Sequence, residues 1–504
     1  MPSSAAARPP QAFSLKAWGG RGPVPAAVLL AITALGAMLS FYRIGALSFW
    51  TDEICTMMFI SHPLRELIHI LWPTQMNMVL YYYLVYFWHH ILPHSSDGAL
   101  RAISAAFSIA AIPAVYCFAR TISSDKTIAT ATGFGAALLL SLNGYRVQFA
   151  QELRSYSLAL LLVTLSSLFL VKAIQKPQSA KFWVAYVLAS TAGVYAHLFV
   201  GFVILAHAIS LLAPLAKHPR GFPLKRAIVS YLAIALLISP LVVATRLTGT
   251  ATIAWVTAPT LADIVETGVL LTGDQGNELL ILFLLAIGIG IAASRKNPEP
   301  NIEGYGTVYL SIVCLVLPMT LTLILSYAYR PIFVNRYFVF LQPFLVTLAS
   351  YGIAKLVVDS STILKLAGAA LFTGLMVLSA VGVANQFNGR EKEDWRGVTR
   401  FLRAECAGPE DLRLYAPVWT RFYPGYYDYG LDPGEAAAGR VPEDPDAEQL
   451  ARLASRSYRE VCLVASPLGD RSASDAVRSV IRASYPNVTV SRFAGEMEVD
   501  VYTR

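Results

Sequence analysis

The stretch Leu47-Ser-Phe-Trp-Thr-Asp-Glu-Ile-Cys55 follows directly on the first long apolar run of the chain. Its Asp52 and Glu53 are the first acidic residues in the sequence. One interpretation is an ordinary helix start, because Thr51 or Asp52 can cap an N-terminus and acids favour the first turn. The other is a functional carboxylate pair held at a membrane surface. The rest of the sequence helps to choose between them.

The composition is that of a membrane protein. Of the 504 residues, 55% are hydrophobic and only 14% are charged, whereas a soluble domain carries about 25% charged residues. The net charge of +8 does not point to a nucleic-acid partner, because no basic patch is interleaved with aromatic residues. Most Lys residues instead fall in short loops between apolar runs, as membrane topology requires.

Apolar runs of about 20 residues predict membrane-spanning helices. The first run lacks a following small-residue cleavage site, so we expect a retained helix and not a signal peptide. Residues 77–91 form a shorter, aromatic run, for which an interfacial helix is more typical than a span. We therefore predict eleven spans, near residues 26–45, 99–120, 127–144, 156–174, 182–196, 199–216, 227–245, 278–294, 305–327, 337–357 and 363–384.

The placement of basic residues supports this count. With 77–91 lying on the membrane, the inner loops up to residue 384 hold sixteen Lys and Arg residues and the outer loops hold eight, with every Lys inside. Positive charge favours the cytoplasmic side, so residues 1–25 are expected to be a cytoplasmic tail. Counting 77–91 as a span would invert every later loop and abolish the bias. The outer basic residues are all arginines, which suit bidentate phosphate contacts: Arg43, Arg65, Arg101, Arg146, Arg154, Arg246, Arg330 and Arg336.

Beyond residue 384 the composition changes. Alternating segments such as 412–415 and 461–464 predict strands, and helical patterns near 395–404, 447–457 and 473–483 separate them. We therefore expect a small α/β domain in residues 385–504, after a transmembrane domain in residues 26–384. An odd number of spans places the α/β domain outside.

The five cysteines show no CxxC pair and no Cys/His spacing typical of a zinc site. Cys406 and Cys462 both fall in the tail and can pair if it faces an oxidising compartment. The sequence leaves open whether they meet.

Several other ionisable residues share the predicted outer face with Asp52 and Glu53. Glu152 and Arg154 lie in a short turn, where a local ion pair would contribute little if exposed. This turn is wedged between two spans, however, and charges in that setting usually mark function. Arg330 and Arg336 flank a Pro-containing turn before a span, where they can hold a phosphate. The alternative is Arg snorkelling near a helix end.

Two further candidates have strong structural explanations. His197 ends a span, and a lone histidine there is more often a satisfied interface residue. Tyr82 belongs to the aromatic run 77–91, which an interfacial aromatic belt explains. The functional alternative is an amphipathic helix that roofs a lipid-facing groove.

No GxxxxGK[ST], no GxGxxG at a strand–helix junction and no HExxH occurs. The sequence therefore shows no sign of a nucleotide phosphate loop, a dinucleotide fold or a metalloprotease.

Six short motifs, in this order and spacing, resemble those of the GT-C superfamily of membrane glycosyltransferases. The resemblance is to the group of protein O-mannosyltransferases and lipid A aminoarabinose transferases, and it spans residues 26–400. The motifs are Phe49-Trp-Thr-Asp-Glu53, Asn77-Met-Val-Leu-Tyr-Tyr82, Arg101, Gln151-Glu-Leu-Arg-Ser-Tyr156, Asn335-Arg-Tyr-Phe338 and Glu393-Asp-Trp-Arg396.

The resemblance implies an all-α polytopic fold with juxtamembrane helices in the first outer loop. It also implies a polyprenyl-phosphate-linked sugar donor that enters from the outer leaflet. By motif, Asp52 would be the base and Glu53 its neighbour, with Arg101 and Arg336 near the lipid phosphate. The residues that would line the second outer loop are Glu152, Arg154 and Tyr156.

The chain departs from the family at one motif, because Asn77-Met-Val stands where the family often has one or two prolines. That departure can alter the shape of the pocket or the substrate. Some superfamily members use a divalent metal and others do not, so the resemblance leaves a metal cofactor open.

We therefore predict a hexosyl- or pentosyltransferase of a bacterial inner membrane. It would transfer one sugar, with inversion, from a polyprenyl phosphate to a hydroxyl of a protein, lipid or polysaccharide at the outer face. Membrane lipid is an expected partner and nucleic acid is not. The alternatives are a transporter or flippase, and a non-catalytic binding protein for a lipid-linked sugar. Transporters bind near the midplane between internal repeats, whereas the charges here gather at one interface and no repeat is found.

Overall fold

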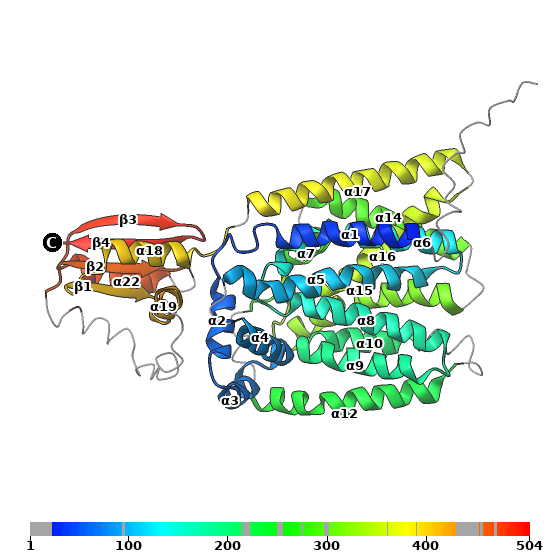
Figure 1. The fold of residues 1–504 in the computed structure, drawn as a ribbon, viewed down its shortest axis with the longest axis horizontal. Helices are drawn as coiled ribbons and strands as arrows, with labels where there is room; N and C mark the ends of the chain where they lie inside the picture. The colour runs from blue at the N-terminus through cyan, green and yellow to red at the C-terminus, as the bar shows by residue number, and fades with distance from the viewer. Residues whose placement is uncertain are drawn as a thin grey trace, which may run out of the picture.

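The structure is a computed structural model, and it describes residues 23–92, 96–212, 215, 222–248, 256–273, 276–296, 302–359, 361–389, 391–429, 453, 457–467 and 471–504. Most of the described chain is a bundle of long helices, and a small α/β unit lies at one end of that bundle (Figure 1).

The helices up to residue 389 include both long and short ones. They are α1 (Pro23–Phe41), α2 (Thr51–Ile60), α3 (Leu64–Thr74), η2 (Met76–Met78), α4 (Val79–Ile91), α5 (Asp97–Ala119), η3 (Arg120–Ile122), α6 (Lys126–Ser141), α7 (Gly144–Ala150), α8 (Tyr156–Gln175), α9 (Ala180–Ala196), α10 (Val200–Ser210), α12 (Leu224–Thr248), α13 (Leu261–Thr272), α14 (Gly276–Lys296), α15 (Ile302–Ala328), η5 (Asn335–Leu341), α16 (Gln342–Val357) and α17 (Thr362–Asn388).

The elements after residue 390 form the C-terminal α/β unit. They are α18 (Trp395–Glu405), β1 (Asp411–Ala416), η6 (Val418–Arg421), α19 (Phe422–Tyr429), β2 (Glu460–Ala465), α22 (Arg471–Arg482), β3 (Asn487–Phe493) and β4 (Met497–Thr503). A polytopic helical protein with a small C-terminal α/β unit is therefore confirmed.

The described part of the structure contains fewer candidate spans than the sequence predicted. Among the described residues, eight helices are long and apolar enough to cross a membrane, or nine if α6 and α7, bent by 61°, form one broken span. Each of the eleven predicted spans falls on a helix, but α9 has 17 residues and α10 only 11. The predicted count of eleven is therefore not confirmed.

Helix α16 is the centre of the bundle. The span that includes it, Asn335–Val357, is 94% buried, whereas the window in α1 is only 11% buried. Gly352 lets α16 touch α14 backbone to backbone, because a Cβ at this position would lie 1.9 Å from the carbonyl oxygen of Ala286. A larger residue would separate the two helices.

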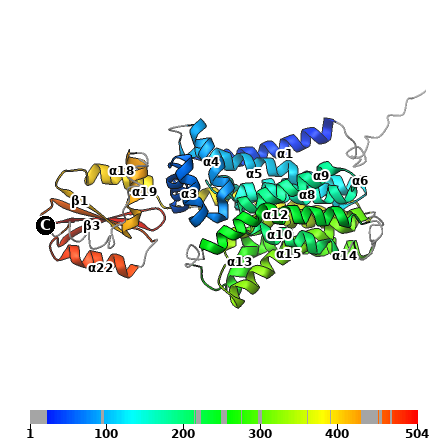
Figure 2. The same cartoon turned by 90° about the horizontal axis from the view of Figure 1, so that it is seen from below.

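Three short helices cover the end of the bundle that faces the α/β unit. They are α2, α3 and α4, which lie between the long helices and the sheet (Figures 1 and 2). The predicted interfacial helix at 77–91 corresponds to η2 and α4, and α4 has only 13 residues. It is therefore not among the helices long enough to cross a membrane.

The sheet of the α/β unit has the strand order β1-β2-β4-β3. Strands β1 and β2 are parallel, and β4 is antiparallel to both β2 and β3. Helices α18 and α22 lie on opposite sides of the sheet (Figure 2). Successive residues of β2 face opposite sides of the sheet. Val464 packs in the buried cluster that includes residues of α18, and Leu463 packs in the cluster that includes Ile481 of α22.

A shared core joins the α/β unit to the short helices. Trp395 and Val398 of α18 belong to the same buried cluster as Phe49, Ile54 of α2 and Tyr81 of α4. Burial of this apolar surface fixes the position of the α/β unit against the end of the bundle.

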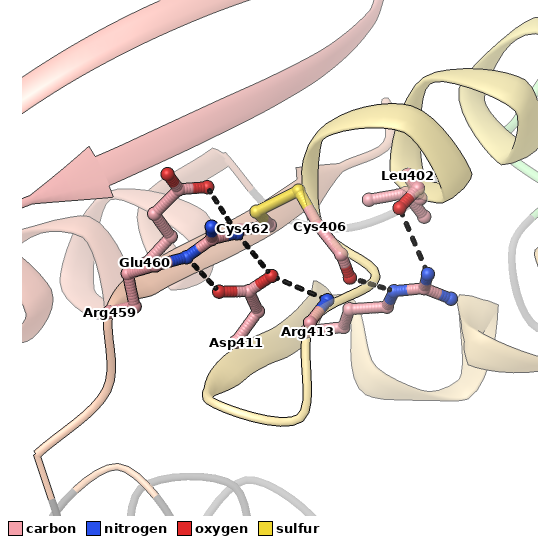
Figure 3. The surroundings of a disulfide bond; sticks show 8 residues. Leu402, Cys406, Asp411, Arg413, Arg459, Glu460 and Cys462 are labelled. Carbon is pink, nitrogen blue, oxygen red and sulfur yellow. Dashed lines mark hydrogen bonds and ion pairs between the residues drawn. A yellow bond between two sulfur atoms is a disulfide. The ribbon is translucent and has the colours of Figure 1, made fainter.

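Cys406 and Cys462 form a disulfide, which settles the pairing that the sequence left open (Figure 3). It ties the end of α18 to β2, and Arg413 supports it by donating hydrogen bonds to the carbonyl oxygens of Cys406 and Leu402 (both 2.9 Å). Strands β1 and β2 and helices α18 and α22 lie where the sequence predicted them. The helix predicted near 447–457 lies outside the described residues, except for positions 453 and 457.

Candidate active site

The acidic stretch forms the first turn of α2, but neither Thr51 nor Asp52 provides a side-chain cap. The cap comes instead from Glu393, more than three hundred residues later in the chain. Its Oε2 accepts hydrogen bonds from the backbone N–H of Thr51 (3.0 Å) and from the Thr51 hydroxyl (2.6 Å). The segment before α18 therefore holds the helix that carries Asp52 and Glu53.

Glu53 is fully buried and bound on every side. Arg101 donates two hydrogen bonds of 2.7 Å to its carboxylate, and the N–H of Leu153 donates a third at 2.8 Å. The Nζ atom of Lys392 lies 3.1 Å from Oε2. Burial alone raises the pKa of Glu53, but Arg101 and Lys392 outweigh burial and hold this pKa at about 2. Glu53 is therefore an anion at neutral pH.

Arg101 uses all five of its N–H donors inside the protein. Besides Glu53, they reach the carbonyl oxygens of Ile44, Leu47 and Ser48 at 2.8–2.9 Å. The sequence predicted Arg101 near a lipid phosphate, but in this conformation it has no donor left for a ligand. It fixes the loop that leads into α2.

Asp52 has a more open environment. Its Oδ2 lies 3.5 Å from Nη2 of Arg154 and 3.7 Å from Nη2 of Arg336, and its side chain is 26% exposed. These distances are ion pairs and not hydrogen bonds. Two guanidinium groups around one carboxylate leave a surplus of one positive charge beside Asp52, which suits an anionic ligand.

Lys392 is a site residue that the sequence analysis missed. Its side chain is 7% exposed, and its ammonium group lies 3.4 Å from Oε1 of Glu152, besides its contact with Glu53. It also stands 5.7 Å from the ring centre of Trp50. The only signal in the sequence was its place next to the motif Glu393-Asp-Trp-Arg396.

The turn between β3 and β4 positions Lys392. Gly495, at the tip, has a φ of +72°, and a Cβ there would lie 2.5 Å from the backbone nitrogen of Glu393. The N–H of Asp394 donates to the carbonyl oxygen of Ala494 (3.2 Å). The sheet of the α/β unit thus presses directly on the segment that completes the ion pairs of Glu53.

A cavity of about 780 Å³ opens beside these residues. Arg336, which is ion-paired with Asp52, lines it together with Glu152, but Asp52 itself does not. The complete lining is Trp50, Tyr145, Gln148, Phe149, Glu152, Val256, Thr257, Pro259, Asp263, Leu270, Phe333, Val334, Asn335, Arg336, Glu391, Lys392, Glu393, Pro467, Gly495 and Glu496.

His197 and Tyr156 belong to an aromatic cluster beside the arginines. The ring of His197 is fully buried and lies 4.9 Å from the ring of Tyr337 and 5.9 Å from that of Tyr156. Burial, with help from Arg154 and Arg336, lowers the pKa of His197 to about 3, so the ring is neutral. Its Nε2 has no hydrogen-bond partner among the described residues.

Tyr82 and Arg330 differ in their relation to the site. Tyr82 is buried in α4, its hydroxyl donates to Gln75 (3.3 Å), and burial raises its pKa to about 12, although the nearby Arg154 opposes that rise. The side chain of Arg330 has no hydrogen bond or ion pair with any described residue, and it is not part of the cavity lining. The structure does not bring Arg330 into the cluster.

The described residues contain no group of three or more His, Cys, Asp or Glu side chains that could hold a metal ion. Around Asp52 the neighbouring charges are cationic, which is the wrong sign for a metal ligand set. We therefore derive no step through a metal.

A scan against protein-family models and a search of the curated proteins both found no match. The chain is similar to the crystal structure of ArnT from Cupriavidus metallidurans in the apo state, with a TM-score of 0.60, 11% identity and coverage of 95% of this chain and 98% of that one. ArnT bound to undecaprenyl phosphate gives a TM-score of 0.56 at 10% identity, over 94% and 97% of the two chains. ArnT is a lipid A aminoarabinose transferase. Identities this low establish the fold alone, and this protein has the GT-C fold that its sequence predicts.

Proposed function

We propose that this protein is a glycosyltransferase that moves one sugar from a polyprenyl phosphate to an acceptor hydroxyl. The observation that carries the proposal is Asp52, a partly exposed carboxylate between Arg154 and Arg336 at the edge of a large cavity. The likeness to an ArnT structure that binds undecaprenyl phosphate supports the choice of donor.

In the proposed reaction, Asp52 accepts the proton of the acceptor hydroxyl as a general base. The acceptor oxygen forms a bond to the anomeric carbon, and the bond from that carbon to the phosphate oxygen breaks. Its electron pair leaves with the polyprenyl phosphate, and attack from the opposite face inverts the anomeric configuration. A phosphate is already a good leaving group, so no acid catalyst is required.

Arg336 and Arg154 stabilise the charge that develops on the departing phosphate. Lys392 adds a third cation at the wall of the cavity. Glu53 and Arg101 do not touch the substrates in this proposal. They hold α2 and its entry loop, and thereby position Asp52.

We place the site at the outer face of a bacterial inner membrane, with the N-terminus in the cytoplasm. The positive-inside distribution of Lys supports this orientation. The disulfide between Cys406 and Cys462 also supports it, because such bonds form in oxidising compartments.

A transporter is the weaker alternative. The charged cluster comes from α2, from the turn before α8, from η5 and from the segment before α18, and its ion pairs hold these parts together. Helix α2 lies at the end of the bundle that faces the α/β unit (Figure 1). Transport sites lie near the midplane of the membrane.

The test uses membranes that carry either wild-type protein or Asp52→Asn, incubated with a panel of radiolabelled polyprenyl-phosphate sugars and endogenous acceptors. We expect wild-type turnover with one donor, and a loss of about 10²–10⁴-fold in Asp52→Asn, typical of a removed general base. Donor binding should persist in the variant. Undiminished turnover would remove Asp52 from the mechanism, and wild-type binding without turnover would favour a non-catalytic binding protein.

A further inference from the structure

A second cavity of about 480 Å³ lies within the C-terminal α/β unit. It sits where β2 ends and α22 begins, at the carboxyl end of a parallel strand, which is where α/β sheets commonly bind ligands. Its lining is Ala465, Ser466, Pro467, Ser474, Asp475, Arg478, Arg492, Phe493, Glu496, Met497 and Glu498.

The two cavities are neighbours. Pro467 and Glu496 line both of them, so the end of β2 and the β3–β4 turn stand between the two spaces. Each volume falls within the range of about 300–1,000 Å³ that holds a single small ligand. Two neighbouring cavities of this size suit an extended molecule that reaches from the α/β unit toward Arg336.

The lining of the second cavity carries more negative than positive charge, because Arg478 and Arg492 face three acids, Asp475, Glu496 and Glu498. Arg478 donates to Glu498 (2.6 Å), to Asp500 (2.7 Å) and to Asp475 (3.3 Å), and Arg492 donates to Glu498 (3.2 Å). Ion-paired carboxylates keep lone pairs that can accept hydrogen bonds. Such a lining suits a neutral polar ligand better than an anion.

The cavity beside Asp52 disfavours an anionic acceptor. Its described lining includes five acids against Arg336 and Lys392, and like charges at an interface cost affinity. The cations near Asp52 are the groups that the proposed reaction assigns to the donor phosphate. An anionic acceptor would compete with the donor phosphate for these cations.

We infer that the acceptor is an uncharged glycan, whose terminal sugar enters the cavity beside Asp52 while its preceding sugars occupy the cavity of the α/β unit. Phe493 offers a half-buried aromatic ring against which the C–H face of a sugar can pack. The paired carboxylates and guanidinium groups accept and donate hydrogen bonds to the hydroxyls. This inference rests on the proposed function, and it names the acceptor class.

The test is a binding measurement, so that it does not depend on turnover. Saturation-transfer NMR with the full-length protein in detergent would use mannotetraose, maltotetraose and cellotetraose, each beside the methyl glycoside of the same sugar. We expect one tetrasaccharide to bind about tenfold more tightly than its methyl glycoside, since each additional hydrogen bond adds a few-fold to affinity. No binding of any tetrasaccharide by the wild type would overturn the inference.

Two substitutions locate the binding. Ser474→Trp fills the cavity and should abolish the advantage of the tetrasaccharide, whereas Ser484→Trp, exposed beyond the end of α22, should not. If Ser474→Trp fails to fold, Asp475→Ala serves, because this side chain is 69% exposed. Its matched control is Glu405→Ala on the surface of α18. Equal binding by the cavity variants and their controls would contradict the inference.

Two further measurements distinguish a failure of the proposed function from a failure of the glycan inference. Asp52→Asn should bind the tetrasaccharide normally, so a lack of turnover with retained glycan binding would count against the proposed function alone. A serine- and threonine-containing peptide panel replaces the glycans in the last arm. Peptide binding that Ser474→Trp abolishes, without glycan binding, would assign the cavity to a protein acceptor and overturn the glycan.

Discussion

The site has a closed side and an open side, built on two adjacent residues. Glu53 is fully buried, and both of its hydrogen bonds to Arg101 are 2.7 Å long. Asp52, one residue earlier, is 26% exposed, and its nearest guanidinium nitrogens lie at 3.5 and 3.7 Å. Two adjacent carboxylates in the first turn of α2 thus have opposite environments.

The difference separates positioning from chemistry. A carboxylate whose lone pairs all accept hydrogen bonds from the protein cannot bind a proton or a ligand without losing some of these hydrogen bonds. A group held loosely by long ion pairs can do both. The closed side therefore holds the helix in place, and the open side is free to react.

The largest effect is expected from Glu53→Ala. It leaves Arg101 buried without its carboxylate partner, which typically costs about 3–5 kcal/mol of folding free energy. Thermal unfolding of the detergent-solubilised protein would measure the loss. Asp52→Ala is the control and should cost under about 1 kcal/mol, as partly exposed ion pairs do. Equal destabilisation by the two substitutions would erase the distinction between the sides.

An arginine-to-lysine substitution can be made on the closed side, at Arg101, and on the open side, at Arg336, to compare the two. Arg101→Lys replaces five fixed donors by three and loses the bidentate grip on Glu53, so we expect a loss of about 1.5–3 kcal/mol in stability. Arg336→Lys should leave stability nearly unchanged and reduce kcat/KM by about 10–10²-fold. Unfolding midpoints and initial rates, measured on both variants, give the two numbers. A stability loss confined to Arg336→Lys would reverse the assignment.

Gly495→Ala tests whether the sheet supports the closed side. The new Cβ would lie 2.5 Å from the Glu393 nitrogen, so the turn must move away. This movement would also displace Lys392 and weaken its ion pairs. We expect a cost of about 1–3 kcal/mol, typical of overpacking, and a lowered kcat. The control is Gly425→Ala in α19, where a Cβ would meet nothing within 4 Å. If both variants behave like the wild type, the turn does not position Lys392.

The pH dependence of stability is a smaller effect. The pKa of Glu53 is lowered from 4.5 to about 2 in the folded protein, so its contribution to stability is fully present above pH 4.5. That contribution is lost as the pH falls from 4.5 toward 2, because the unfolded state then binds the proton first. Chemical unfolding of the wild type and of Glu53→Gln, measured at several pH values, gives the free energy of unfolding as a function of pH. Between pH 4.5 and pH 2 this free energy should fall more steeply for the wild type. Parallel curves would contradict the assignment.

The smallest effect is expected from Arg330→Ala. This side chain has no partner among the described residues and does not line the cavity, so stability should change by no more than about 0.5 kcal/mol. Turnover should equal that of the wild type. A large loss of turnover would return Arg330 to the substrate-binding set that the sequence predicted.

The ion pairs of the open side join residues that the sequence placed on one face. Asp52, Arg154 and Arg336 each lie at the end of an apolar run, so topology alone brought them to the same face. The spans and the α/β unit followed from hydropathy and alternation in the same way. The count of spans did not, because α9 and α10 are short and α6 and α7 are bent.

The closed side was much harder to predict. Whether a buried Arg faces a ligand or a carboxylate depends on contacts such as Arg101 with Glu53, which are 48 residues apart in the chain. Lys392 reaches Glu53 across 339 residues, and no local pattern reports such a distance. The strand pair β3–β4 was also missed, although its turn presses on Lys392.

The place of Lys392 in the chain gives assembly of the site a definite order. Asp52 and Glu53 are synthesised with the first helices, but Lys392 and Glu393 follow only after α17, and the turn at Gly495 follows about one hundred residues later again, between β3 and β4. A nascent or truncated chain can therefore insert its whole helical bundle and still lack a finished active site. Formation of the last strand pair is therefore the step that brings the turn at Gly495 against Glu393 and completes the surroundings of Lys392.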